Sequence, residues 1–126
     1  MNGLERYMAV LNGKEPDFVP RTPILMRFAA EYIGSNYGEF ASDYRVLVES
    51  NKQCARDFGM DQVSCISDPY RETQGFGAEI TYMKDDVPRS THPLAETKDL
   101  SVLKDPDPLK SERMLDRIKA ARKFKK

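Results

Sequence analysis

The sequence is poor in the residues that build disulfides and metal sites. Its 126 residues include two cysteines, one histidine and no tryptophan. Cys54 and Cys65 do not have CxxC spacing, so we expect buried, reduced thiols rather than a disulfide framework. With His92 as the only histidine, no zinc motif can be assembled from this segment. We therefore expect no metal site within these residues.

Long apolar runs are also missing. No stretch approaches the roughly 20 residues of a transmembrane helix. The residues that follow Met1 lack the apolar core of a signal peptide. We therefore expect a cytoplasmic protein without a membrane partner.

The sequence has no excess of positive charge. Its 20 Lys and Arg residues balance 20 Asp and Glu residues, whereas a nucleic-acid binder carries a basic footprint. Only the tail KAARKFKK gathers cations, and cations in the last turn of a helix complement the helix dipole. We therefore expect no nucleic-acid partner.

The residues that are present describe one α/β domain. Apolar residues make up 40% of the chain and charged residues 32%, a globular mixture, and the length suits a single domain. Apolar positions follow helical spacing in some segments and form short apolar or alternating runs in others. We expect helices over 3–12, 28–33 and 43–58, strands at 23–26 and 62–66, a hairpin within 77–92, one or two helical turns at 97–103, and a last helix from about 111.

The order of strand, helix and strand over residues 23–66 predicts one βαβ unit with parallel strands, because its helix is long enough for a crossover. The hairpin is then an insertion. Two parallel strands and a hairpin are too few to close a barrel or to cover a doubly wound sheet. We therefore expect an incomplete chain, either the front of a longer protein or one whose open sheet edge is covered by another copy.

Two charged residues follow the predicted parallel strands at the same end. Arg27 comes after the first strand and Asp68 after the second, and this rim is where α/β proteins place active sites. An arginine binds a substrate carboxylate, an aspartate stabilises a developing positive charge, and Tyr70 is placed to line the same cleft. The structural alternatives are an Arg27–Asp68 ion pair, or an Arg27–Glu31 pair at i, i+4.

Three segments, taken in order, resemble the uroporphyrinogen decarboxylase superfamily. ERYMAVLNGKEPDFVP is similar to its opening helix and connector, and LMRFAAEYIG resembles its MRQAGRY stretch. DQVSCISDPYRETQGFGAEI looks like its strand and loop, in which FSD precedes a glycine-rich turn. The resemblance implies a (β/α)8 TIM barrel. Residues 1–126 are then a single unit, the incomplete N-terminal part of the barrel, with the first βα units, an N-terminal helix and an inserted hairpin.

The resemblance also implies roles for individual residues. Asp68 matches the FSD aspartate, which in the decarboxylases stabilises a cationic intermediate derived from a pyrrole. Arg27 matches the first arginine of MRQAGRY, which binds substrate carboxylates. Glu31 stands where that motif has its second arginine, and Phe28 where it has glutamine. A glutamate at this position repels a polycarboxylate tetrapyrrole.

The same superfamily includes corrinoid-dependent methyltransferases, which move a methyl group between a cobalamin protein and a small acceptor. The connector and the HPLAETKDL stretch look closer to these enzymes. The resemblance implies a corrinoid-protein or small-molecule substrate, with zinc ligands in the second half of the barrel. We therefore expect no cofactor and no turnover in this segment alone. A uroporphyrinogen decarboxylase of porphyrin biosynthesis, and a non-catalytic remnant that folds by self-association, remain the alternatives.

Overall fold

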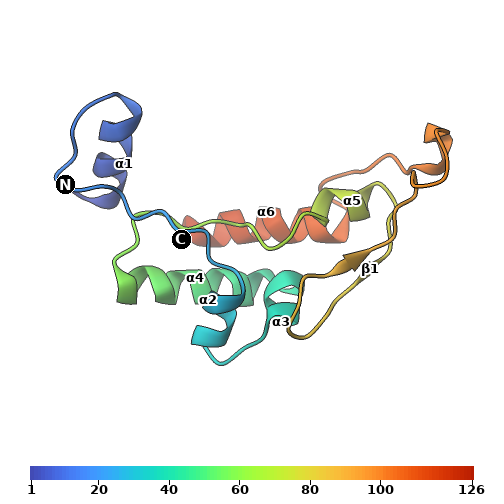
Figure 1. Cartoon of the computed structure of the whole chain (residues 1–126), viewed down its shortest axis with the longest axis horizontal. Coiled ribbons are helices and arrows are strands. Elements are labelled where there is room, and N and C mark those ends of the chain that lie inside the picture. Colours follow the sequence, from blue (N-terminus) through green and yellow to red (C-terminus); the bar gives the residue numbers. More distant parts are fainter.

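A computed structural model describes residues 1–126, and it is mainly helical, with its helices distributed along one long axis (Figure 1). The N-terminal helix lies at one end of this axis, and a small hairpin with the loop that follows it lies at the other. The elements are α1 (Gly3–Leu11), α2 (Arg27–Tyr32), α3 (Tyr37–Ser42), α4 (Tyr44–Phe58), α5 (Arg71–Gly75), β1 (Ile80–Thr81), β2 (Arg89–Ser90), η1 (Leu100–Val102) and α6 (Glu112–Phe124).

Helix α4 is the central element, and local sequence determines both of its ends. At its start the Asp43 side chain accepts a hydrogen bond from the Arg45 amide, as an N-cap residue should. At its end Gly59 adopts the left-handed conformation with φ of 60°, which glycine reaches without a Cβ clash. The predicted helix over residues 43–58 is therefore confirmed.

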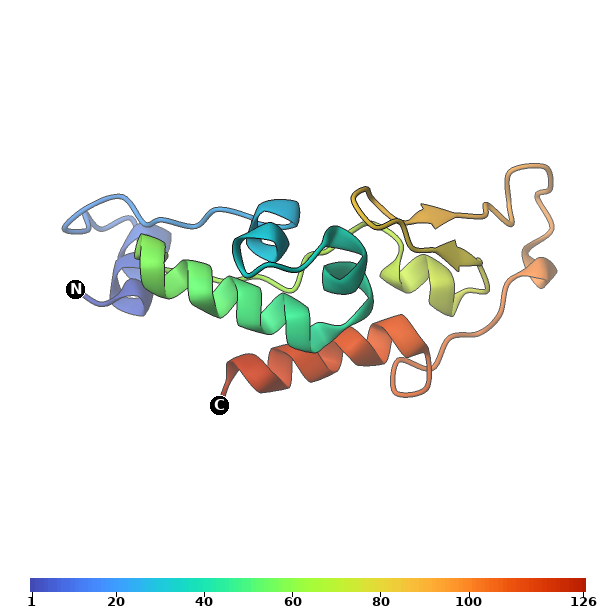
Figure 2. The same ribbon diagram turned by 90° about the horizontal axis from the view of Figure 1, so that it is seen from below.

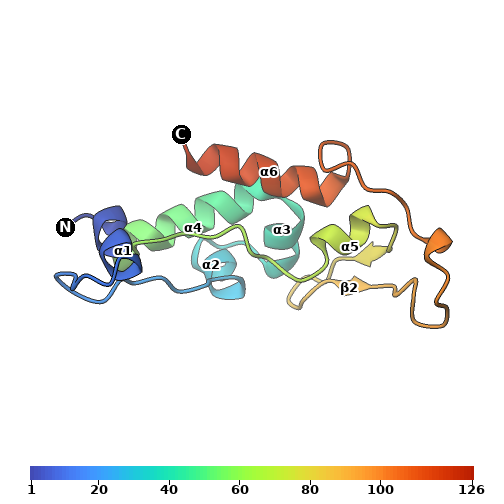
Figure 3. The same ribbon diagram turned by 90° about the horizontal axis from the view of Figure 1, so that it is seen from above.

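The core lies where α2, α3 and α6 pack on α4. Figures 2 and 3 show α4 and α6 side by side, both running from the hairpin end toward the α1 end. Consecutive outer helices of a βα repeat have this parallel orientation. The buried apolar cluster consists of Ala29, Ala30, Tyr37, Phe40, Leu47, Val48, Cys54 and Ala120. Both cysteines are free thiols, and burial raises the pKa of Cys54. No helix is both long enough and apolar enough to cross a membrane.

The two predicted parallel strands do not form within this chain. Neither residues 23–26 nor residues 62–66 form a strand. A backbone hydrogen bond of 2.8 Å from the Asp61 amide to the Arg21 carbonyl links the residues just before the two segments. A strand needs a continuous ladder of N–H and C=O partners on a neighbour, and neither segment has one here. Their apolar side chains stay partly exposed, with Ile24 at 59% and Ile66 at 42%. The expected βαβ sheet was therefore wrong for the isolated segment.

The hairpin is present but much shorter than predicted. Strands β1 and β2 pair antiparallel over two residues each, with Ile80 opposite Ser90. The loop between them packs on the start of α3, where the Gly38 amide donates to the Lys84 carbonyl at 3.0 Å. A Cβ at Gly38 would lie 2.5 Å from the Met83 carbonyl oxygen, so only glycine permits this approach. The hairpin loop is thus held against the helical core.

Two short helices were not predicted. Helix α3 begins at Asn36, whose side chain accepts a hydrogen bond from the Glu39 amide, so a capping residue was present as a signal. Helix α5 has no side-chain cap, and it begins where the Tyr70 amide bonds to Asp68. Both helices span only five or six residues, too few for a helical repeat of apolar positions to be recognised.

Candidate functional site

The Asp68 carboxylate is the centre of a buried polar network. Arg113 on α6 donates to both of its oxygens, with Nη1 2.8 Å from Oδ1 and Nη2 2.5 Å from Oδ2. The Ser67 hydroxyl donates to Oδ2 at 2.7 Å, and the Tyr70 amide donates to Oδ1 at 3.0 Å. The side chains of Asp68 and Arg113 are 0% and 2% exposed. All four strong acceptor positions of this carboxylate are therefore filled by the protein itself.

This pairing keeps Asp68 ionised despite its burial. Burial alone favours the neutral acid, but the hydrogen bonds from Arg113 and Ser67 favour the anion more strongly, so the pKa of Asp68 lies below its ordinary value. Burial likewise opposes the charge of Arg113, and the bonds to Asp68 outweigh it and raise the pKa of Arg113. The two groups form a charged, doubly bonded pair.

A second buried arginine extends the network. Arg71 on α5 is fully buried, and its Nε donates to the Ser67 hydroxyl at 2.9 Å. Its Nη1 donates to Asp116 at 2.8 Å and to the Arg113 carbonyl at 3.0 Å, both on α6. Arg113 also donates to the Ala41 carbonyl at 3.0 Å, at the end of α3. The network therefore ties α3, α5 and α6 together around the residue that follows the predicted second strand.

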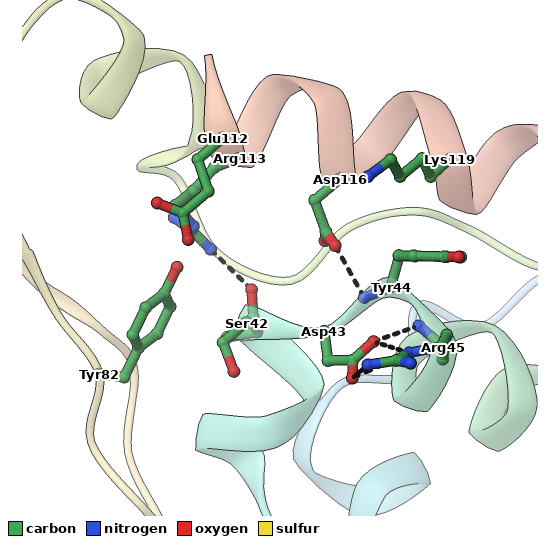
Figure 4. A pocket seen from close by; sticks show the side chains of 10 residues that line it. Ser42, Asp43, Tyr44, Arg45, Tyr82, Glu112, Arg113, Asp116 and Lys119 are labelled. Carbon is green, nitrogen blue, oxygen red and sulfur yellow. Dashed lines mark hydrogen bonds and ion pairs between the residues drawn. The ribbon is translucent and has the colours of Figure 1, made fainter. Parts of the chain in front are cut away.

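A polar pocket of about 400 Å³ lies beside this network, between α6 and the junction of α3 with α4 (Figure 4). Four of the charges that line it are already paired: Asp43 with Arg45, Asp116 with Arg71, and Arg113 with Asp68. Asp68 does not line this pocket, although its partner Arg113 does. The lining residues are Ala41, Ser42, Asp43, Tyr44, Arg45, Tyr82, Glu112, Arg113, Asp116 and Lys119.

Arg27 forms the surface pair with Glu31 that the sequence offered as a structural alternative. Its Nε lies 2.7 Å from Glu31 Oε1, and its Nη1 donates to the Asp85 carbonyl at 2.9 Å. The side chain is 57% exposed, and the bond to Glu31 raises the pKa of Arg27. Arg27 and Asp68 make no ion pair or hydrogen bond with each other. Of the two structural alternatives, the Arg27–Glu31 pair is therefore the one that forms, and the placement of Arg27 and Asp68 on one rim stays a prediction.

Tyr37 connects the surroundings of the two predicted residues. Its hydroxyl donates to the Ser67 carbonyl, next to Asp68, and its ring lines a small cleft together with Arg27. Burial, then the negative charges of Asp68 and Asp86, raise the pKa of Tyr37. Tyr70 contributes its backbone amide to Asp68, and its side chain forms no hydrogen bond with the network.

Sequence reasoning missed Arg113, which binds Asp68, and also Arg71 and Tyr37, which bind the neighbouring Ser67. Arg71 was visible in the run SDPYR, three residues after Asp68, and its proximity was a usable signal. Arg113 lies 45 residues beyond Asp68, so only the packing of α6 brings the two together. Tyr37 carried no signal apart from its place next to a capping asparagine.

The residues of this chain do not fit a metal site. No group of three His, Cys, Asp or Glu side chains lies close enough to hold a metal ion. The zinc that the family resemblance implies has no ligand set among these residues.

The parallel packing of α4 and α6 and the turn around Asp68 are typical of a TIM-barrel-like α/β fold of the uroporphyrinogen decarboxylase type. The family model described as "Uroporphyrinogen decarboxylase (URO-D)" matches residues 2–126. The chain belongs to this family.

Two relatives and one solved structure extend the comparison. Uroporphyrinogen decarboxylases from two strains of Chloroflexus aurantiacus are each 33% identical over 99 residues, which cover 71% of this chain and 28% of each relative. A methyltransferase from Methanosarcina mazei superposes with a TM-score of 0.79 over 99% of this chain and 38% of its own, at 21% identity. This likeness confirms the predicted TIM-barrel-like fold at a coarse level. The chain spans less than a third of the length of the Chloroflexus relatives.

Proposed function

We propose that this chain is the N-terminal segment of a corrinoid-dependent methyltransferase that moves a methyl group from a cobalamin protein to a small acceptor. The observation that carries the proposal is the closed pair between Arg27 and Glu31, with Nε 2.7 Å from Oε1. The family resemblance assigns Arg27 to substrate carboxylates, and here its charge is already matched by a carboxylate of the same helix. A substrate that depends on arginine clamps for many carboxylates is therefore disfavoured.

The proposal agrees with the name of the structural relative, the Methanosarcina mazei methyltransferase. At 21% identity that likeness concerns the fold, so the choice between reactions depends on residues 27–31. A small acceptor needs no polycationic site, and the residues around Arg27 supply none.

Asp68 remains the proposed catalytic residue, with Arg27, Glu31 and Tyr70 as the proposed residues of the substrate site. A substrate atom reaches the Asp68 carboxylate only by replacing one of its four donors. The Ser67 hydroxyl is the neutral side-chain donor among them. Its bond is the easiest to exchange, because a hydroxyl can rotate toward another acceptor, whereas Arg113 carries a full charge and the Tyr70 amide is fixed in the backbone.

The decisive experiment assays the full gene product that carries this chain for two reactions in parallel. We expect methyl transfer from a methylcobalamin-loaded protein to a small thiol, and no decarboxylation of uroporphyrinogen. Decarboxylation without methyl transfer would overturn the proposal and establish the alternative.

That alternative, a uroporphyrinogen decarboxylase, is favoured by one specific observation. The relatives at 33% identity carry that name, and the aspartate of the FSD-like turn is present and ionised. The family model matches residues 2–126, which include the position at which Glu31 replaces the second arginine of the MRQAGRY motif. A further test substitutes Glu31→Arg in the full gene product and measures decarboxylation of uroporphyrinogen. We expect no decarboxylation to appear, because the acidic residues Asp85 and Asp86 remain beside Arg27.

The third hypothesis, self-association of the isolated chain, rests on an exposed aromatic cluster. The rings of Phe28, Tyr32 and Phe58 pack against one another with centroids 5.0–5.8 Å apart, and each residue is 43–52% exposed. Phe28 and Phe58 also line an apolar cleft of about 460 Å³ that includes Leu25 and Met60. Exposed apolar patches of this kind mark interaction surfaces.

We expect light scattering to show dimers or larger species of the isolated chain. The double substitution Phe28→Ser and Phe58→Ser should shift the mass toward the monomer, because it removes two of the three rings. The control is Leu100→Ser, which removes a 69% exposed residue at the other end of the molecule. A monomeric unmodified chain, or an equal effect of the control, would contradict the hypothesis.

A further inference from the structure

A small cleft of about 210 Å³ opens at the start of α2, where the hairpin loop packs on the helical core. It lies next to Arg27 and is separate from the larger pocket of Figure 4. Its lining residues are Met26, Arg27, Tyr37, Asp85, Asp86 and Val87.

Backbone contacts hold the hairpin loop in this position. The Lys84 carbonyl accepts from the Gly38 amide at 3.0 Å, and the Asp85 carbonyl accepts from Arg27 Nη1 at 2.9 Å. The Asp86 side chain accepts from the Val87 amide at 2.7 Å, which orders the turn. The absence of a Cβ at Gly38 lets the loop approach this closely. The two aspartates are therefore fixed beside Arg27 by the fold.

The charge around this cleft is negative. Arg27 is its one cation, and Glu31 pairs with it at 2.7 Å. Asp85 and Asp86 form no ion pair, and Lys84 does not line the cleft. One guanidinium thus faces three carboxylates. The rest of the lining is the Tyr37 ring, the Met26 thioether and the Val87 side chain, none of which adds positive charge.

We infer that the hairpin loop, through Asp85 and Asp86, determines substrate charge at the Arg27 cleft: it rejects polycarboxylates and admits neutral or cationic groups. This inference rests on the proposed function, since it gives the reason why a family member with Arg27 does not use that arginine to bind carboxylates. It adds two residues, far from α2 in sequence, to the effect of Glu31. The Tyr37 ring and the Met26 thioether form an apolar, polarisable wall that suits a neutral or cationic group.

The size of the effect follows from like-charge repulsion. Asp85 and Asp86 are exposed, so solvent and salt weaken their repulsion of an incoming carboxylate. We expect about tenfold weaker binding of a polyanion for each uncompensated carboxylate, as is typical for unit charges a few ångströms apart near a surface.

The test measures binding of a polycarboxylate without any turnover. The probe is uroporphyrin, the stable fluorescent porphyrin whose carboxylates match those of the decarboxylase substrate, titrated into this chain at low salt. We compare the unmodified chain with the triple variant Glu31→Gln, Asp85→Asn and Asp86→Asn. All three residues are exposed, so the variant should keep its circular dichroism spectrum and thermal midpoint.

The control variant removes two negative charges elsewhere in the chain, Glu96→Gln and Asp105→Asn. Both residues are exposed and neither forms an ion pair. We expect the triple variant to bind uroporphyrin at least about tenfold more tightly than the unmodified chain, and the control to change its affinity by less than about threefold. Adding Arg27→Gln to the triple variant should abolish the gain.

Equal affinity of the unmodified chain and the triple variant would overturn the inference, and so would a gain of equal size in the control. The result is independent of the methyl-transfer assay, because no reaction is measured. If the uroporphyrin affinities are equal, the proposed methyltransferase function is still tested by the methyl-transfer assay. If methyl transfer is absent, the binding comparison still tests the role of Asp85 and Asp86.

Discussion

Asp68→Asn should lower the free energy of unfolding by about 3–5 kcal/mol, the usual cost of removing one partner of a buried ion pair. The substitution keeps the size of the side chain, but it leaves the Arg113 guanidinium, 2% exposed, without a counter-charge. The amide group of asparagine also places N–H donors where Arg113 already donates. Urea denaturation followed by circular dichroism measures the loss.

The matched control is Asp43→Asn, which removes the carboxylate of an exposed pair with Arg45. Asparagine caps a helix as well as aspartate does, so α4 keeps its N-cap and only the ion pair is lost. We expect a loss below about 1 kcal/mol, as for other surface ion pairs. If Asp68→Asn costs no more than this control, the buried pair does not contribute as described.

The buried pair of Asp68 and Arg113 makes the free energy of unfolding depend on pH, and the sign of this dependence follows from the pKa of Asp68. The pKa of Asp68 in the folded state lies below its ordinary value of about 3.9, so the unfolded chain binds the proton more readily. The pair therefore stabilises the fold fully above about pH 5, and the stabilisation is lost as the pH falls through the folded pKa. Urea denaturation between about pH 5 and pH 2 tests this sign. The urea midpoint should fall less over this range in the Asp68→Asn variant than in the unmodified chain.

Arg71→Met should lower the free energy of unfolding by a similar amount, about 3–5 kcal/mol. Arg71 is fully buried, and its removal leaves Asp116, 15% exposed, without its cation. The Ser67 hydroxyl and the Arg113 carbonyl also lose a donor. Methionine fills much of the volume, so the loss reports the missing hydrogen bonds more than a cavity. Urea denaturation again measures the change.

The same interface provides the control for this substitution. Arg117 on α6 pairs with Glu72 on α5, so it joins the same two helices, but its side chain is 34% exposed and that of Glu72 54%, whereas Arg71 is fully buried. We expect Arg117→Met to cost about 1 kcal/mol or less. Equal losses for Arg71→Met and Arg117→Met would show that burial does not distinguish these pairs.

In the full gene product, the stability losses expected for Asp68→Asn and Arg71→Met have to be separated from losses of activity. Because Asp68 is both the proposed catalytic residue and part of a buried pair, a loss of turnover in Asp68→Asn has two sources. Turnover must be measured where the variant is still folded, with Arg71→Met as a variant of similar instability that leaves the Asp68 carboxylate in place. A much larger loss of turnover in Asp68→Asn than in Arg71→Met would support the catalytic role.

Helix periodicity and capping residues accounted for much of the fold. The helix at 43–58 was predicted from its apolar spacing, and the structure bounds it with Asp43 and Gly59, which act within a few residues of that pattern. The strands at 23–26 and 62–66 were predicted from apolar runs alone, and they did not form because a strand needs partners that this segment does not contain.

The candidate site was predicted only in part for the same reason. Asp68 was found from its place after an apolar run and from the family resemblance, and the Arg27–Glu31 pair was foreseen as a local i, i+4 contact. Arg113 was not foreseen, because its contact with Asp68 spans 45 residues. The loop aspartates Asp85 and Asp86 lay within the hairpin predicted at 77–92, and no role was assigned to them.

The sequence by itself determined the family of this protein, the main helices and the replacement of a family arginine by Glu31, because these depend on residue identity and short-range spacing. The tertiary structure alone decided which charges pair across distant parts of the sequence. Packing of α6 brings Arg113 to Asp68, and the absence of a side chain at Gly38 lets the hairpin loop carry two carboxylates to Arg27. Such long-range contacts depend on how whole elements pack, and no local pattern in the chain specifies them.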